Sequence, residues 1–453
     1  MKFLAENSSL EIVFADIKEA IFGSFVSRQK NKLFIFTIMK LIGPFKQILT
    51  LNNLPLRGKL SDEQLEIIEN GGILINNDNL IEEVVDFEKL KSDFPNAELE
   101  PRTSNLEPQI LLPAFIDCHT HICFGGNRAN DFAMRNAGKT YLEIAEKGGG
   151  IWSSVQHTRN ASEKELLETL LERINRLISL GITTIEIKSG YGLNAESELK
   201  MLRVIQQAQT KTKATLVPTC LSAHLKPRDF EGNNEEYLQY IVDEILPKVK
   251  EENLAKRVDI FIEKSAFQPE ESRKFLEKAK ALGFEITVHA DQFTAGSSRI
   301  AVEVDAVSAD HLEATIDEDL EFLAKSETVA VALPGASLGL GEPFTPARKI
   351  LDKNGILAIA SDWNPGSAPM GNLITQASIL ATFQKLSTAE VLAGITFRAA
   401  KALNLTDRGV LKKGMKADFV VFETNNFQNI LYNQGSLMAS EVYIDGRIIN
   451  CNQ

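Results

Sequence analysis

The sequence predicts an α/β protein: a closed (β/α)8 barrel of the TIM type with a small β-sandwich domain built from both chain ends. Short apolar runs alternate with segments of helical spacing between residues 110 and 403, which is the order of elements in such a barrel. Five of the six histidines follow these runs, in four different loops. Because the active sites of barrels lie at the C-terminal ends of the strands, these loops predict one shared pocket.

The expected strands are short runs of apolar and β-branched residues. They cover residues 110–117, 182–187, 215–221, 258–262, 285–288, 306–309, 329–333 and 356–360. Helices are expected between them, around residues 163–180, 195–209, 235–249, 269–282 and 345–353, with one more after Thr315 and others within 372–403. Eight strands separated in this way predict the closed barrel.

Local signals mark where several helices begin and end. Ser162, Thr315 and Ser387 each precede a glutamate by three residues, and this capping-box spacing predicts a helix start. Pro269 fits a first helical turn, and Gly181 fits the end of the preceding helix. These boundaries separate the helices from strands that follow at once and support the alternating pattern.

A doubly wound open sheet is the rival architecture. It would carry a glycine-rich phosphate loop after its first strand and would gather its polar residues at one switch point. No GxGxxG follows residue 117, and the polar residues are spread over many strand ends. The closed barrel is therefore the expected form.

The two ends of the chain predict a second, β-rich unit. Short apolar runs with turn signals occur in residues 39–107 and 410–453, and we expect these segments to form one composite β domain beside a barrel of residues 108–409. Residues 1–38 are expected to be a poorly ordered N-terminal extension. Their most apolar stretch, residues 33–39, is too short to span a membrane.

The charge balance limits the classes of partner. The net charge is -12, whereas binding to nucleic acid or to an anionic membrane needs a basic face. A local basic pocket for a small anionic substrate is compatible with that charge. The four cysteines have no CxxC spacing, which predicts free thiols and a cytoplasmic protein.

The residue types just past the strands predict a metal site. His119 and His121 lie on the same side of an extended segment, because side chains alternate along a strand. Together with His289 after the fifth strand and Asp362 after the eighth, they can bind a divalent metal ion and leave a position for water. Such an ion lowers the pKa of that water, and Asp362 is placed to accept the proton.

Four other polar residues at strand ends have competing interpretations. His224 and His311 either contact substrate or water, which their positions favour, or are structural. Glu263 is either the buried partner of a histidine or a catalyst. Lys188 can bridge two metal ions only as a carbamate, and its place before a glycine-rich loop favours a single ion.

Several motifs resemble the imidazolonepropionase family of the amidohydrolase superfamily. The segment PAFIDCHTH at residues 113–121 resembles the first metal motif of the superfamily. Further segments resemble the imidazolonepropionase family in particular. They lie at residues 124–128 (FGGNR), 148–151 (GGGI), 186–193 (EIKSGYGL), 289–292 (HADQ), 309–311 (ADH) and 361–367 (SDWNPGS). The resemblance runs from about residue 40 to the C-terminus, and KSGYGL and DxNPGS are its most specific parts.

This resemblance implies an enzyme that hydrolyses the ring amide of 4-imidazolone-5-propanoate to N-formimino-L-glutamate in histidine degradation. It implies one zinc or iron ion, between which imidazole and carboxylate ligands do not discriminate. The implied metal ligands are His119, His121, His289 and Asp362. The implied substrate contacts are Arg128, Tyr191, His224, Gln292, Asn364, Gly366 and Ser367. The family also suggests a homodimer.

The residue types suit this substrate. Arg128 offers a guanidinium fork to the propanoate carboxylate, and Tyr191 lies in a glycine-flanked loop that can approach a ligand closely. We expect Asp362 to accept a proton from water and to deliver it to the leaving ring nitrogen. Either His224 or His311 is expected to stabilise the developing oxyanion.

Two other functions are compatible with the sequence. Another mononuclear-metal amidohydrolase or deaminase would act on a related cyclic amide or amidine, and would have less need of a carboxylate clamp at Arg128. A metal-binding interaction protein would have lost a ligand, and none of the four is missing. Gln292 stands where some relatives carry glutamate; because an amide cannot act as a base, it is expected only to hydrogen-bond the ring.

Overall fold

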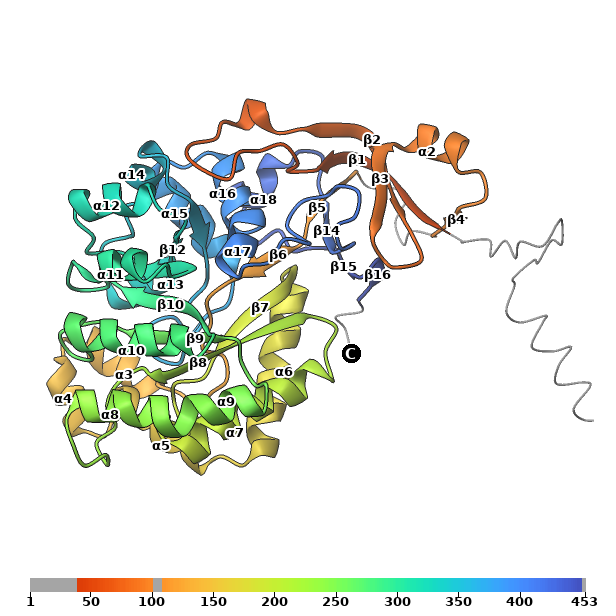
Figure 1. Ribbon diagram of the computed structural model, residues 1–453. Helices are drawn as coiled ribbons and strands as arrows, with labels where there is room; N and C mark the ends of the chain where they lie inside the picture. Colours follow the sequence, from red (N-terminus) through yellow and green to blue (C-terminus); the bar gives the residue numbers. More distant parts are fainter. Residues whose placement is uncertain (1–38, 101–107, 450–453) are drawn as a thin grey trace, which may run out of the picture.

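The computed structural model describes residues 39–100 and 108–449, and an eight-stranded parallel sheet occupies its centre (Figure 1). The strands follow one another around this sheet in chain order. They are β6 (Phe115–Asp117), β7 (Ile182–Lys188), β8 (Thr215–Ala223), β9 (Arg257–Phe261), β10 (Glu285–Ala290), β11 (Ser308–His311), β12 (Val329–Ala332) and β13 (Leu357–Ile359). The predicted (β/α)8 fold class is confirmed.

The barrel closes just beyond its first and last strands. Thr120 forms a parallel bridge with Trp363. The backbone N–H of His121 donates to the carbonyl of Trp363 at 2.9 Å, and the N–H of Asp362 donates to the carbonyl of His119 at 3.0 Å. The closing seam therefore consists of the two segments that carry the predicted metal ligands.

Helices surround the barrel on its outside (Figure 1). Those that follow β6 to β9 are α3 (Ala129–Asn136), α4 (Tyr141–Glu146), α5 (Ile151–Asn160), α6 (Glu163–Ser179), α7 (Ala195–Gln209), α8 (Asn234–Tyr240), the π-helical turn η2 (Ile241–Ile245), α9 (Leu246–Glu251) and α10 (Pro269–Ala281). Those that follow β10 to β14 are α11 (Ser297–Glu303), α12 (Asp317–Ala324), α13 (Pro334–Leu340), α14 (Ala347–Asp352), α15 (Leu373–Gln384), α16 (Thr388–Gly394), α17 (Phe397–Ala402) and α18 (Gln428–Tyr432).

Helix α6 shows why these segments are helical. Ser162 forms the predicted capping box with Glu165, and Leu166, Leu170 and Ile174 are buried on one face. Burying one such side chain contributes about 1.5–3 kcal/mol, whereas an N-cap contributes about 1 kcal/mol. Packing of the apolar face against the barrel therefore holds this helix, and the cap sets where it begins.

The capping box predicted at Thr315 is wrong. The N-cap of α12 is Ile316, without a side-chain cap. The hydroxyl of Thr315 instead donates to Asp291 Oδ2 at 2.8 Å, because Asp291 is fully buried and needs hydrogen-bond donors. The hydroxyl of Thr315, which the local pattern assigned to the helix cap, therefore forms a tertiary contact instead.

A second sheet is built from both ends of the chain, as predicted. Its strands form one path in the order β16-β15-β14-β5-β1-β2-β3, with β4 beside β1, and Figure 1 shows the early and late strands side by side. They are β1 (Lys40–Leu49), β2 (Ile67–Ile75), β3 (Ile81–Asp86), β4 (Glu98–Leu99), β5 (Gln109–Pro113), β14 (Phe419–Glu423), β15 (Glu441–Ile444) and β16 (Arg447–Ile448), with η1 (Asp62–Gln64) and α2 (Phe87–Asp93) between the early strands.

The expected single strand at residues 110–117 is in fact two strands in different sheets. Strand β5 pairs with β1 and β14, whereas β6 pairs with β7 of the barrel. The change occurs at Ala114, whose N–H donates to the carbonyl of Asp418, while the next N–H, of Phe115, donates to Gly181. A continuous apolar run cannot reveal this change, because both of its halves are buried.

Some expectations fall outside the described part of the chain. The predicted extension at residues 1–38 lies outside the described residues, as do 101–107 and 450–453. Among the residues that are described, no helix is both long and apolar enough to cross a membrane.

Candidate active site

Three imidazoles converge at the C-terminal end of the barrel. His119 and His121 come from the segment after β6, and His289 comes from β10. The Nε2 atom of His121 lies 3.2 Å from Nε2 of His119 and 3.2 Å from Nε2 of His289. The three ligand atoms lie within 4.8 Å of one another, and all three residues are buried. The geometry is that of a set of ligands facing a common point.

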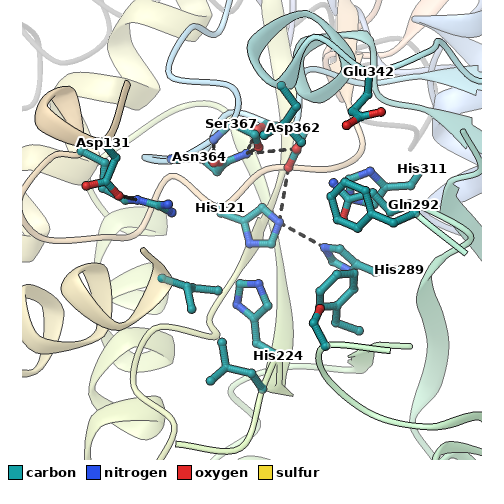
Figure 2. A pocket seen from close by; sticks show the side chains of 18 of the residues that line it. His121, Asp131, His224, His289, Gln292, His311, Glu342, Asp362, Asn364 and Ser367 are labelled. Carbon is teal, nitrogen blue, oxygen red and sulfur yellow. Dashed lines mark hydrogen bonds and ion pairs between the residues drawn. The ribbon is translucent and has the colours of Figure 1, made fainter. Parts of the chain in front are cut away.

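Asp362 supplies a carboxylate to the same point. Its Oδ1 lies 3.5 Å from His119 Nε2 and 3.4 Å from His121 Nε2, and Figure 2 shows it facing His121. Its backbone φ of 50° is in the left-handed region, a strained conformation that is typical of functional sites. Burial raises the pKa of Asp362 to about 7, although the charge on His311 and a hydrogen bond from Asn364 oppose that shift.

These four residues fit a metal ion. Tetrahedral ligand atoms about 2.0–2.1 Å from zinc lie about 3.3 Å from each other, and the distances of 3.2 to 3.5 Å match this spacing. Burial lowers the pKa of His119 and of His121 well below the usual range. Neutral imidazoles therefore turn nitrogen lone pairs toward the common point, as metal binding requires.

Two further carboxylates fix how two of the imidazoles are turned. Asp310 Oδ2 lies 2.6 Å from Nδ1 of His119, and Asp259 Oδ2 lies 2.9 Å from Nδ1 of His289. A carboxylate at Nδ1 favours the tautomer that carries hydrogen there, which leaves Nε2 free to bind metal. Neither aspartate was identified as a site residue from the sequence. The available signal was a charged residue inside an apolar strand, which needs a buried partner.

Lys188 lies below the imidazoles and is almost completely buried. Its Nζ is 2.8 Å from Glu186 Oε1, 2.8 Å from Asp259 Oδ2 and 3.8 Å from Asp310 Oδ2. Burial alone would lower the pKa of Lys188, but the three carboxylates outweigh burial and raise it. The side chain is thus an ammonium group, whereas a carbamate can form only on a neutral amine.

His224 and Tyr191 lie on one side of the imidazole cluster. The ring of His224 stacks on His121 with centroids 5.5 Å apart, and Tyr191 lies 5.5 Å from His224. Nδ1 of His224 donates to the carbonyl of Gly190 at 3.0 Å. Its Nε2 is therefore a hydrogen-bond acceptor as long as the ring is neutral. Burial, assisted by the charge of His289, lowers the pKa of His224 to about 3 and keeps it neutral.

The loop that carries Tyr191 is held by Glu198, which the sequence did not single out. One carboxylate oxygen, Oε1, accepts hydrogen bonds from the backbone N–H groups of Gly192 at 2.7 Å and Leu193 at 2.8 Å. The other accepts from the hydroxyl of Ser222 at 3.2 Å. A buried carboxylate with several backbone donors is well satisfied, so Glu198 fixes the shape of this loop.

His311 differs from His224 in its charge environment. Its Nδ1 lies 3.5 Å from Glu313 Oε1. Burial would lower the pKa of His311, but the carboxylate of Glu313 outweighs burial and raises it. A φ of 85° at His311 is a second strained position of the site. His311 therefore keeps its second ring proton to a higher pH than His224 does, and it is the better hydrogen-bond donor of the two.

A guanidinium group lies at the far side of the cavity from His289 and His311. Nε of Arg128 donates to Asp131 Oδ2 at 2.7 Å, and Figure 2 shows Asp131 on the side of the pocket opposite His289 and His311. The loop after Asp362 approaches this arginine so closely that a Cβ added to Gly366 would lie 2.3 Å from its Nη1. Any larger residue at position 366 would displace the guanidinium group of Arg128.

Asn364 shapes the rest of that loop. Its Nδ2 donates to Asp362 Oδ2 at 3.0 Å and to the hydroxyl of Ser367 at 2.9 Å. Its Oδ1 accepts from the backbone N–H groups of Gly366 and Ser367. The metal-facing carboxylate and the loop near Arg128 are thus one hydrogen-bonded unit.

Of the two expected roles of Glu263, partnership with a histidine is not found among the described residues. The carboxylate of Glu263 accepts from the backbone N–H of Phe293 at 3.0 Å and of Thr294 at 3.1 Å. It holds the loop that follows Gln292.

A cavity of about 530 Å³ joins these groups. Of the predicted site residues, those that line it are His121, Arg128, Tyr191, His224, His289, Gln292, His311, Asp362, Asn364, Gly366 and Ser367. His119 lies beneath it, fully buried. The fold thus brings every predicted site residue to one place.

Comparisons with known proteins give the family. The model of the amidohydrolase family matches residues 110–449. An imidazolonepropionase of Fusobacterium nucleatum subsp. nucleatum is 40% identical over 407 residues, which is 89% of this chain and 97% of that protein. The imidazolonepropionase of Clostridium tetani is 38% identical over 387 residues, covering 85% of this chain and 92% of that protein. The chain belongs to the imidazolonepropionase family of amidohydrolases. The predicted resemblance is confirmed.

Similarity to solved structures concerns the fold. A triazine hydrolase variant superimposes with a TM-score of 0.70 at 18% sequence identity, over 90% of this chain and 94% of the other. At this identity the match supports the architecture alone, a barrel with a second sheet made from both chain ends.

Metal binding is expected to weaken as the pH falls below about 7. Asp362 binds a cation only when ionised, and in the metal-free protein its pKa is about 7. Binding then releases one proton below that pH, so the affinity should fall about tenfold from pH 8 to pH 6 and level off above pH 8. Competition with a chelator at pH 6, 7 and 8 measures this. Equal affinities at pH 6 and pH 8 would contradict the role of Asp362.

Proposed function

We propose that this protein hydrolyses the ring amide of 4-imidazolone-5-propanoate to N-formimino-L-glutamate, a step of histidine degradation. The observation that carries the proposal is a single cavity with the imidazole–carboxylate cluster at its base and the Arg128 guanidinium at its side. A small substrate with a ring amide and a carboxylate complements this cavity, because the amide can face the cluster while the carboxylate faces Arg128. Membership of the imidazolonepropionase family supports the same activity.

Substrate orientation rests on Arg128 and the loop at residues 364–367. The guanidinium binds the propanoate carboxylate as a charge-assisted pair, and Asp131 holds the guanidinium in place. The ring then lies toward His121, between Tyr191 and Gln292. The neutral Nε2 of His224 accepts a hydrogen bond from a ring N–H, because its Nδ1 hydrogen already bonds Gly190.

His119, His121, His289 and Asp362 would hold the catalytic metal ion. When bound, that ion lowers the pKa of a water molecule and polarises the ring carbonyl. Asp362 accepts the proton of the attacking water and delivers it to the ring nitrogen as the carbon–nitrogen bond breaks. The ring of His311 donates a hydrogen bond to the oxyanion that develops on the carbonyl.

His224 and His311 are therefore expected to respond differently to substitution. His311→Asn should lower kcat about 10²- to 10³-fold with little change in KM, because an oxyanion donor acts in the transition state. His224→Asn should mainly raise KM, because a ring contact is present in the ground state as well. Steady-state kinetics of both variants measure this difference. The opposite pattern would assign the oxyanion to His224.

We further propose that the centre holds one ion, either zinc or iron. The protonated Lys188 supports a single ion, because an ammonium group with three carboxylate partners cannot serve as a bridging carbamate. Analysis of metal content per chain, together with the activity regained on adding each metal to the metal-free protein, tests both points.

The remaining expectations are part of the same proposal. The protein acts in the cytoplasm, binds no nucleic acid or membrane, and forms a homodimer as the family suggests. Its residues 39–107 and 410–453 make the composite β domain and 108–409 the barrel. Sedimentation of the purified protein tests the homodimer, and limited proteolysis tests the domain boundaries.

Product analysis is the direct test of the function. The purified holoenzyme is incubated with freshly generated 4-imidazolone-5-propanoate, and N-formimino-L-glutamate is followed by mass spectrometry. Its formation at a rate proportional to enzyme concentration is the expected result. Turnover of cytosine or guanine, without turnover of the imidazolone, would favour the alternative of another amidohydrolase or deaminase.

A further inference from the structure

One ammonium group lies beneath the metal-binding imidazoles and contacts the groups that hold them. Lys188 has 1% of its side chain exposed. The same oxygen of Asp259 that lies 2.8 Å from Lys188 Nζ also lies 2.9 Å from His289 Nδ1. The same oxygen of Asp310 that faces Lys188 at 3.8 Å lies 2.6 Å from His119 Nδ1. Each aspartate oxygen is therefore fixed between the lysine and one imidazole.

The third carboxylate, that of Glu186, links Lys188 to the segment between His119 and His121. Glu186 Oε1 lies 2.8 Å from Lys188 Nζ, and its Oε2 accepts from the backbone N–H of Thr120 at 3.2 Å. The hydroxyl of Thr120 also donates to the carbonyl of Glu186 at 2.6 Å. Since Thr120 separates His119 from His121, this contact fixes the backbone that presents both rings.

We propose that Lys188 is a positioning residue of the metal centre, whose ammonium group ties together the three carboxylates that orient the metal-binding histidines. The proposal rests on the metal site of the proposed function but not on any particular substrate. Without the lysine, Asp259 loses the ammonium that holds its Oδ2 at Nδ1 of His289. Asp310 Oδ2 keeps the hydroxyl of Thr287 at 3.2 Å but loses its cation. Both imidazoles are then held less firmly toward the common point. Partners of metal ligands typically contribute 10- to 100-fold to metal affinity.

Lys188→Met tests this, with metal affinity as the readout. The substitution keeps an unbranched side chain that lacks only the terminal ammonium group, and it removes the charge. The dissociation constant for Zn²⁺, measured by competition with a chromophoric chelator, is expected to rise about 10- to 100-fold. In the cobalt-substituted protein the visible absorption bands are expected to shift, because they report the arrangement of the ligands. Neither measurement needs substrate, so each can fail independently of the proposed activity.

A charge-matched variant separates positioning from charge balance. Lys188→Met leaves three buried carboxylates without their cation and can unfold the protein. The double variant Glu186→Gln/Lys188→Met restores the net charge of the cluster, so the metal-free protein should regain thermal stability while metal affinity stays low. Wild-type affinity in the double variant would overturn the proposal.

Lys200→Met is the matched control. The Lys200 ammonium donates to three backbone carbonyls, those of Thr158, Arg159 and Ala161, away from the metal ligands. Its loss should lower the unfolding temperature and leave Zn²⁺ affinity unchanged. A second ion per wild-type chain whose binding depends on bicarbonate would also overturn the proposal, because Lys188 would then be a carbamate ligand.

Discussion

Replacing Asp362 with asparagine is expected to lower kcat by at least about 10³-fold while the protein stays folded. The carboxylate does two jobs in the proposed mechanism, because its Oδ1 faces the imidazole nitrogens and it accepts the proton of the attacking water. Nδ2 of Asn364 donates to Oδ2 of Asp362. An asparagine that keeps its oxygen toward this donor turns its own NH₂ group toward the imidazoles, where it can neither bind metal nor act as a base.

The fold should tolerate this change. The pKa of Asp362 is raised to about 7, chiefly by burial, so the folded metal-free protein keeps this proton up to about pH 7. A raised folded-state pKa means that this group stabilises the fold at low pH and that its contribution is lost as the pH rises toward 7. The neutral asparagine carries no such loss, so metal-free Asp362→Asn should unfold no earlier than metal-free wild type at pH 8.

The measurements are kcat, metal content and thermal unfolding at pH 8. Asp305→Asn is a suitable control, because Asp305 is exposed and pairs only with Lys280 in the described residues. It should behave as wild type in all three. Rates near the wild-type value in Asp362→Asn would remove this residue from the mechanism.

Replacing Arg128 with methionine is expected to raise KM about 10- to 100-fold and to change kcat much less. A hydrogen bond to a charged group contributes about 1.5–3 kcal/mol, and the propanoate group is distant from the bond that breaks. Asp131 would lose one partner, but its Oδ2 would still accept from the N–H of Gly150 at 2.8 Å. The N-terminal turn of α3 should therefore keep its position.

A substrate without the carboxylate makes this test specific. The methyl ester of the imidazolone should be hydrolysed equally by wild type and Arg128→Met, because neither protein can form the ion pair with it. Arg228→Met removes one exposed cation that lies over Trp152, outside the cavity, and should leave both substrates unaffected. An unchanged KM in Arg128→Met would separate Arg128 from the propanoate.

Local patterns in the chain were sufficient to predict the barrel and the cluster of imidazoles and a carboxylate at the ends of its strands. Apolar runs of strand length alternate with helical spacing, and the residue after a strand projects at the open end of a barrel whatever the details of packing. For this reason His121, His289 and Asp362 could be predicted to share one site. The capping boxes at Ser162 and Ser387 could be predicted for the same reason, because both groups of each pair lie in one turn.

Other features required the packed molecule. Thr315 has the spacing of a helix cap but bonds Asp291, and one apolar run supplies strands β5 and β6 to two different sheets. Burial gives no local signal for either outcome, because it depends on which segment lies opposite.

The sequence by itself determined the chemistry of this protein: the residue types and their places at strand ends define a cluster of imidazoles and a carboxylate. The tertiary structure alone decided which buried carboxylates orient which histidines. Closure of the barrel brings the loop of Asp362 against that of His119. Lys188, Asp259 and Asp310 meet only because the alternate strands β7, β9 and β11 point them at the same interior point. Partners across strands are set by register and distance in space, and no spacing along the chain encodes them.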